Sequence, residues 1–121
     1  MKNNKRAVGR APHLAAATAR CEAETRWVAA EIAHQPRSKD QAALFIKFVA
    51  VAEFCHQLRN YFSLFNVVCA LGSPDVRRLK KVMKLVPEKV HLRLQALETI
   101  INPSRNMKVW TFLLFTFIFF I

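Results

Sequence analysis

Glycine is scarce in this chain, which has two glycine residues among 121. The valine, isoleucine and threonine residues do not form alternating runs either, so the sequence gives little support to an all-β fold. Alanine, leucine and phenylalanine dominate instead, and 53% of the residues are hydrophobic, which excludes a disordered chain. We therefore predict an all-α fold, an irregular helical bundle that forms one domain or part of one.

Catalytic and metal-binding patterns are also missing. The sequence contains no H-E-x-x-H, Walker, G-x-G-x-x-G or G-x-S-x-G motif. The four histidines are scattered, and Cys55 and His56 point to different sides of a helix because they are adjacent. Glu22, Glu24 and Glu31 could form a carboxylate pair, but glutamates on an exposed helix face are far commoner. We expect no catalytic residue, metal or cofactor, and thus no enzyme of covalent chemistry.

The cysteines show no pairing pattern. Cys21, Cys55 and Cys69 are odd in number and have no C-x-x-C spacing. The alanine-rich stretch after Pro12 is interrupted by Arg20, so a signal peptide is not indicated. We expect free thiols in a reducing compartment, and place the protein in the cytoplasm with membrane association as a second location.

Positive charge is concentrated in two segments. The net charge is +11, of which residues 1–10 hold +4 and residues 76–93 hold +6. Such clusters bind nucleic acid, anionic lipid or acidic protein surfaces, or are simply solvated. Tyr61 and the two tryptophans are not interleaved with the basic residues, so we expect no nucleic-acid partner. Peripheral membrane association through the basic segments or the C-terminal tail stays open.

Helix signals divide the middle of the chain. Ser38 stands three residues before Gln41, which is the spacing of a capping box. Gly72 suits a helix end, and Ser73 followed by Pro74 suits the start of the next helix. The second helix is apolar almost all round and therefore needs several partner helices. The expected helices cover residues 12–34, 38–58, 61–71, 74–86 and 87–101.

The two ends differ from this middle part. Residues 1–11 are basic, and we expect a disordered arm there. Residues 109–121, VWTFLLFTFIFFI, carry no charge, but a helix that spans a bilayer needs about 20 residues. We interpret this hydrophobic, Phe-rich tail as an aberrant end, with a hydrophobic anchor as the alternative. The helical domain then occupies residues 12–108.

Several blocks of the sequence resemble one family in the correct order. They are RWVAAEI (26–32), FIKFVAVAEFCHQLRNYFSLFNVVCAL (45–71), VRRLKK (76–81) and LETIINPSRNMK (97–108). Together they resemble the catalytic domain of Ras-family guanine nucleotide exchange factors, called the RasGEF or CDC25-homology domain. The residues that fit the family pattern are Trp27, Glu31, Ile32, Lys47, Phe48, Ala52, Leu58, Asn60, Val76, Arg78 and Leu79.

The resemblance implies a function without bond-breaking chemistry. Domains of this family are all-helical, bind a Ras-like small GTPase of the Ras, Rap or Ral type, and hold its switch II in a hydrophobic pocket. A projecting helical hairpin then displaces switch I, so that nucleotide and magnesium leave. Because the exchanger binds the nucleotide-free GTPase best, it weakens nucleotide affinity by linkage.

The resemblance also assigns residues. The positions that match the switch II-facing surface are Thr18, Ala19, Phe65, Val68 and Gly72. Phe65 is the principal candidate, and a plain core phenylalanine is its alternative. We interpret five other matched positions as mainly architectural: Trp27, Glu31, Asn60, Arg78 and Leu79. A buried amide at Asn60 and a polar bridge between helices would explain such residues without a ligand.

The chain departs from the family pattern in three places, one of which is Gly72, where the family often has a polar residue that faces the GTPase. Where the family often has Asn-Phe-Asn, this chain has Asn60, Tyr61 and Phe62. After Lys108 the family continues into the hairpin, whereas this chain continues into the Phe-rich tail. We therefore predict an incomplete RasGEF domain with impaired exchange. The alternatives are a small basic membrane-associated helical protein anchored by its Phe-rich C-terminus, and a basic nucleic-acid-binding bundle.

Overall fold

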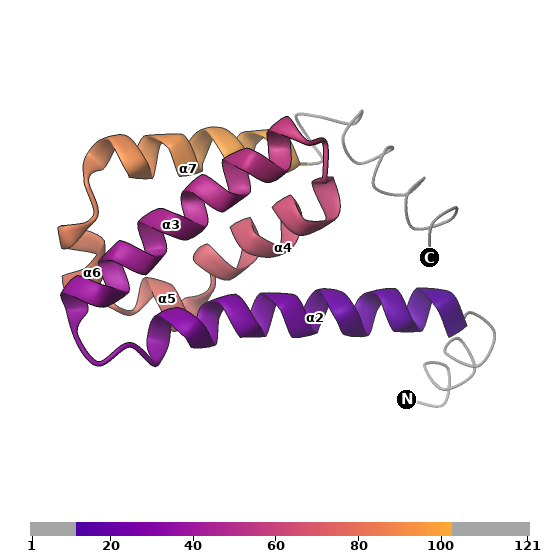
Figure 1. Cartoon of the computed structure of the whole chain (residues 1–121), viewed down its shortest axis with the longest axis horizontal. Helices are drawn as coiled ribbons and strands as arrows, with labels where there is room; N and C mark the ends of the chain where they lie inside the picture. The colour runs from indigo at the N-terminus through magenta and orange to yellow at the C-terminus, as the bar shows by residue number, and fades with distance from the viewer. Residues whose placement is uncertain (1–11, 103–121) are drawn as a thin grey trace.

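The computed structural model describes residues 12–102, and every regular element in this part of the chain is a helix (Figure 1). The predicted all-α fold is confirmed. The basic arm predicted for residues 1–11 and the tail at 109–121 lie outside the described residues. The helices are α2 (Pro12–Ala33), α3 (Ser38–Gln57), α4 (Tyr61–Leu71), α5 (Pro74–Arg77), α6 (Lys80–Leu85) and α7 (Glu88–Ile101).

Helix α3 is the central helix of the bundle. It contacts α2, α4, α6 and α7, so the prediction that this apolar helix needs several partners is confirmed. Figure 1 shows α2 and α7 on opposite sides of α3, with α4 between α3 and α2. Each of the six described helices contributes to the largest fully buried side chains, which are Ile32, Phe45, Val49, Leu64, Asn66, Leu71, Val76, Val82 and Leu94.

The start of α3 differs from the expected capping box. Arg37 occupies the N-cap position and Ser38 is the first helical residue, so no side-chain hydrogen bond caps this end. Gln41 is buried instead, and its Nε2 donates to the Ala33 carbonyl oxygen over 3.3 Å. The amide therefore ties α3 to the end of α2, which a solvent-facing capping residue would not do.

The start of α4 is capped by Asn60. Its Oδ1 accepts a hydrogen bond from the Ser63 backbone N–H over 3.3 Å, as an N-cap side chain should. Asn60 is exposed, so the prediction of a buried amide at this position is wrong. Arg59, in the turn just before it, has a positive φ of 57°, which is a strained backbone conformation for a residue with a Cβ.

One predicted helix is divided into two. Residues 74–86 form α5 and α6, with Leu79 between them in a non-helical conformation. Val76 and Val82 are both completely or almost completely buried. In a continuous helix, a spacing of six residues would turn their side chains about 120° apart. The break lets both valines point into the core. The sequence pattern predicted an apolar stripe that includes both valines, but it did not predict the break.

The last described helix agrees with the range predicted for it, residues 87–101. Its apolar stripe is buried, and it consists of Val90, Leu94, Leu97 and Ile101. Within residues 12–102, no helix combines the length and the apolar character that a membrane span requires. The outward side of α3 carries three exposed apolar side chains that the described helices leave uncovered: Val51, Phe54 and Leu58.

Candidate functional site

A buried polar contact holds α2 and α4 side by side. The Asn66 side chain on α4 is completely buried, and its Nδ2 donates to Glu24 Oε2 on α2 over 2.7 Å. The Cys21 thiol donates to Asn66 Oδ1 over 2.6 Å. Because both ends of the amide are satisfied, the contact fixes the positions along the two helices at which they meet.

Sequence reasoning missed this contact. Glu24 was assigned to an exposed helix face, whereas it is half-buried against α4. The available signal was Asn66 itself, a single amide within the apolar run Leu64–Val68 of a predicted helix. A buried amide has to find partners, so this residue predicts a polar side chain on the neighbouring helix.

The cysteines are free thiols of low reactivity. Burial is the main cause that raises the pKa of Cys21, Cys55 and Cys69, and the charge of Glu24 raises it further at Cys21 and Cys55. These thiols stay protonated at neutral pH and are poor nucleophiles. In the described part of the chain, no group of three histidine, cysteine, aspartate or glutamate residues could hold a metal ion.

The outward face of α2 presents the first predicted site residues. Thr18, Glu22 and Thr25 recur at helical spacing and lie on one face, and Ala19 lies beside them in line with Arg26. Thr18 and Ala19 are both exposed. The structure therefore leaves these two predicted residues accessible to a partner.

The edge of α4 next to α2 presents the others. Phe65, Cys69 and Gly72 recur at helical spacing, and Cys21 of α2 lies close enough to Cys69 to raise the pKa of its thiol. Phe65 is half-buried and packs against the core with part of its ring accessible, while Gly72 is exposed. Val68 is only 3% exposed, so it supports this edge from the core and does not face a partner, contrary to the prediction.

Gly72 is not required by the backbone. Its φ is −90°, which any residue adopts, and a Cβ added there would meet the Val68 carbonyl oxygen at an ordinary 3.5 Å. The turn after α4 therefore does not need a glycine at this position. Its effect is to leave the end of α4 without a side chain at the surface.

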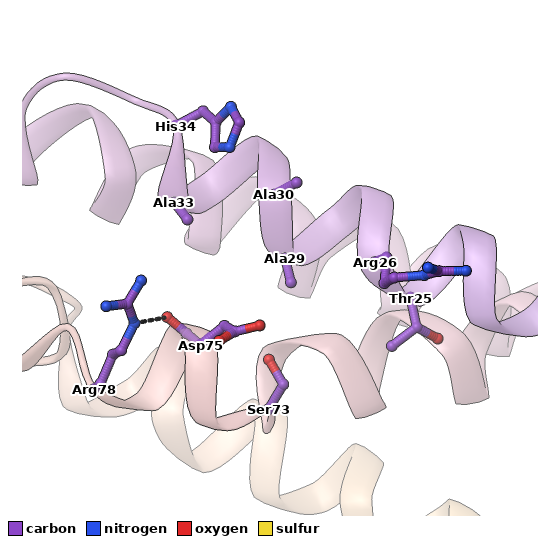
Figure 2. Close-up of a pocket in the computed structure, with 9 residues that line it drawn as sticks. All are labelled: Thr25, Arg26, Ala29, Ala30, Ala33, His34, Ser73, Asp75 and Arg78. Atoms are coloured by element: carbon purple, nitrogen blue, oxygen red, sulfur yellow. Dashed lines mark hydrogen bonds between the residues drawn. The ribbon is translucent and has the colours of Figure 1, made fainter.

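A groove continues this surface toward α5 (Figure 2). A hollow of about 420 Å³ is lined by Cys21, Glu22, Thr25 and Arg26. It shares Thr25 and Arg26 with a second hollow of about 440 Å³, so the two adjoin along α2. The residues that line the second hollow are Thr25, Arg26, Ala29, Ala30, Ala33, His34, Ser73, Asp75 and Arg78.

The far end of the groove is charged. Figure 2 shows the Arg78 guanidinium extending from α5 toward α2 below Ala33, and its Nε donates to the Asp75 carbonyl oxygen over 3.2 Å. Arg78 is exposed and lines the groove. The small alanines of α2 leave the space into which this guanidinium points.

Three further predicted residues lie away from this groove or near its margin. Trp27 is 57% exposed, and its ring lies perpendicular to that of Phe48 with the centroids 5.8 Å apart. Glu31 is exposed, and Leu79 is half-buried against the core between α5 and α6. The polar bridges between helices involve other residues than those predicted: Asn66 with Glu24, Arg77 with Glu98, and Arg93 with Glu53.

Comparison with known proteins assigns the family. The family model for the RasGEF domain matches residues 1–114 of this chain. The chain belongs to the RasGEF domain family. The resemblance inferred for residues 12–108 is thereby confirmed, and the all-α fold agrees with it.

Relatives of this RasGEF domain are much longer proteins. A Rap guanine nucleotide exchange factor of Caenorhabditis elegans is 38% identical over 84 residues, which are 69% of this chain and 6% of that protein. Rap guanine nucleotide exchange factor 6 of Homo sapiens is 33% identical over 84 residues, which are 69% of this chain and 5% of that protein. Ras guanine nucleotide exchange factor Y of Dictyostelium discoideum is 30% identical over 107 residues, 88% of this chain and 7% of that protein.

Proposed function

We propose that this RasGEF domain fragment binds a Ras-like small GTPase and promotes its nucleotide exchange through what we call the α2–α4 surface. This surface consists of the exposed face of α2 and the adjoining edge of α4, with Thr18, Ala19, Phe65 and Gly72 as its contact residues. The observation that carries the proposal is that four of the five residues matched to the family's switch II surface are accessible on two adjoining helices.

The arrangement suits binding rather than bond-breaking chemistry. The α2–α4 surface holds an aromatic side chain, small residues and hydroxyls, and the nearby thiols have raised pKa values. Promotion of exchange then follows from linkage, because a surface that binds the nucleotide-free GTPase best weakens nucleotide affinity by the same factor. The protein is in this sense an exchange factor and not an enzyme of covalent chemistry.

A Rap-type GTPase is the first partner to test. Of the three relatives described above, the two named as Rap guanine nucleotide exchange factors are 38% and 33% identical to this chain, and the one named as a Ras guanine nucleotide exchange factor is 30% identical. Ras and Ral proteins are the alternatives. We further propose a cytoplasmic location with peripheral membrane association, for which the exposed basic residues of α5 to α7 are the support.

The test measures binding and exchange separately. Rap, Ras and Ral proteins, each nucleotide-free or GDP-bound, are titrated with the full chain, and release of a fluorescent GDP analogue is followed. The proposal predicts tighter binding to a nucleotide-free GTPase than to its GDP-bound form. Equal binding to both forms for all three GTPases would contradict it.

The same assay tests the predicted impairment of exchange. The sequence after Lys108 does not resemble the helical hairpin of the family, so nucleotide release is expected to be slower than with a complete RasGEF domain. A release rate equal to that of a complete domain would show this part of the prediction to be wrong and leave the binding proposal standing.

A further inference from the structure

Helix α6 presents lysines and a leucine on one outward face. Four of its six residues are exposed, and they are Lys80, Lys81, Lys84 and Leu85. Their spacing of i, i+1, i+4 and i+5 places them on the same side of the helix. We call these four residues the α6 face.

The rest of the fold fixes this face toward solvent. Val82 is almost completely buried, Met83 packs partly against the core, and α6 contacts α3. The Met83 carbonyl oxygen also lies 3.0 Å from a ring nitrogen of His91 on α7. Because the inner side of α6 is bound to two neighbouring helices, its lysines cannot turn inward. Figure 1 shows α6 at one end of the bundle, where a flat partner can approach it.

The lysine charges are unpaired. No ion pair among residues 12–102 involves Lys80, Lys81 or Lys84. The acids nearest in sequence are Asp75 and Glu88, which flank α6 on α5 and α7. The α6 face itself contains no acid, so its full positive charge is available to an anionic surface.

The exposed leucine of the α6 face favours one class of anionic partner over another. Leu85 is 53% exposed although it belongs to a helix that buries Val82 well. Phosphates of nucleic acid attract lysines but offer nothing to an aliphatic side chain at this position. A membrane surface binds both kinds of side chain, because the lysines contact the anionic headgroups while the leucine enters the boundary between the headgroups and the acyl chains.

We propose that the α6 face is a docking site for anionic phospholipid surfaces. This proposal does not depend on GTPase binding, since the contact residues of the α2–α4 surface lie on other helices. Each lysine near an anionic membrane contributes about fivefold to the partition coefficient, so three lysines together contribute roughly 100-fold. Burial of the exposed part of Leu85 contributes about fivefold more.

The test uses the full chain with sedimented vesicles of phosphatidylcholine alone or mixed with phosphatidylserine. The triple variant Lys80→Gln, Lys81→Gln and Lys84→Gln is expected to lose roughly 100-fold in partitioning onto the mixed vesicles. The matched control is Arg37→Gln, Lys47→Gln and Arg59→Gln, which removes the same charge from exposed positions elsewhere. The control is expected to lose only severalfold, and Leu85→Ser about fivefold.

Three results would overturn the proposal. An equal loss of partitioning onto the mixed vesicles in the two triple variants would show that membrane binding depends only on the net charge of the protein. Equal binding to neutral and mixed vesicles, unchanged in the lysine variant, would assign membrane binding to another segment. Binding of a DNA or RNA oligonucleotide that depends on the three lysines, without vesicle binding, would assign the face to nucleic acid. GTPase binding, measured on the same variants in solution, is expected to be unchanged.

Discussion

Asn66 on α4 donates a hydrogen bond of 2.7 Å to Glu24 on α2, and this pair joins the two helices that carry the proposed GTPase-binding surface. The amide is completely buried, whereas the carboxylate is half-buried at the margin of the interface. Such a pair specifies one alignment of the helices, because any shift along their axes leaves a buried polar group without its partner. The contact residues on α2 and α4 thereby keep a fixed spacing.

Replacement of Asn66 should destabilise the fold. Asn66→Ala removes a fully buried side chain and its two hydrogen bonds, so the free energy of unfolding should fall by about 2 kcal/mol. Urea denaturation followed by circular dichroism measures it. Glu24→Gln keeps an acceptor oxygen for the amide and should cost less than about 1 kcal/mol. Equal stability of Asn66→Ala and the wild type would contradict the structural role.

A carboxylate at position 66 should make stability depend on pH. Asn66→Asp places a second carboxyl group beside Glu24 in a buried contact, and like charges raise the pKa of at least one of them. The charged pair is unfavourable at neutral pH, so the variant should gain stability relative to the wild type as the pH falls and one carboxyl is protonated. Denaturant titrations at several pH values measure this difference. A difference that does not change with pH would contradict it.

The ion pair between Glu53 and Arg93 should make the stability of the fold decrease as the pH falls, whereas the Asn66→Asp variant should gain stability relative to the wild type. The hydrogen bond from the Arg93 guanidinium is the main cause that holds the pKa of Glu53 below its ordinary value of 4.5. A lowered pKa in the folded state stabilises the fold above 4.5, and this contribution is lost as the pH falls through the folded-state pKa. Both side chains are about one-third exposed or more, so solvent screening limits the contribution to at most about 1 kcal/mol.

Glu53→Gln tests this contribution. At neutral pH the variant should be less stable than the wild type by up to about 1 kcal/mol, and the difference should disappear below the folded-state pKa of Glu53. Denaturation at neutral and acidic pH gives the two values. Exposed Glu31→Gln is the matched control, for which we expect no comparable difference. A difference that grows toward acidic pH would contradict the assigned direction of the pKa shift.

The turn between α3 and α4 should tolerate, and gain from, a glycine. Arg59 adopts a φ of 57°, and a left-handed conformation costs a residue with a Cβ about 1–2 kcal/mol. Arg59→Gly removes this strain but adds entropy to the unfolded chain, so we expect a net gain of about 0.5 kcal/mol in the free energy of unfolding. Thermal denaturation measures it. Arg59→Val, which tolerates this conformation worse, should lose stability, and the reverse order would contradict the assigned strain.

Most of the helical framework could be predicted from the sequence because its signals are local. Pro12, Gly72 and Pro87 lie at helix boundaries in the structure as expected, and the apolar stripe of residues 90–101 is buried. The division of residues 74–86 was missed, since the break depends on how the surrounding core packs around Val76 and Val82. The sequence pattern describes one helix at a time and does not contain that information.

The candidate site was predicted in part. Exposed Thr18 and Gly72 agree with a surface role, while Val68 lies in the core and Asn60 at the surface. Whether an apolar residue on α4 faces the core or a partner depends on how α4 is rotated against α2. The contact of Asn66 sets that rotation, and it joins residues 42 positions apart. Local spacing could not reveal it.

The central claim is that the α2–α4 surface binds the GTPase. Its most direct test is the affinity of nucleotide-free Rap for the full chain with Thr18→Arg or Gly72→Arg, because both positions are exposed and a large side chain there obstructs a partner without disturbing the core. Ala43→Arg, at an exposed position on the outward side of α3, is the matched control. We predict that both surface variants weaken binding at least about tenfold, which corresponds to about 1.4 kcal/mol, while the control binds like the wild type. Binding that survives both surface variants, or is lost equally in the control, would contradict the account.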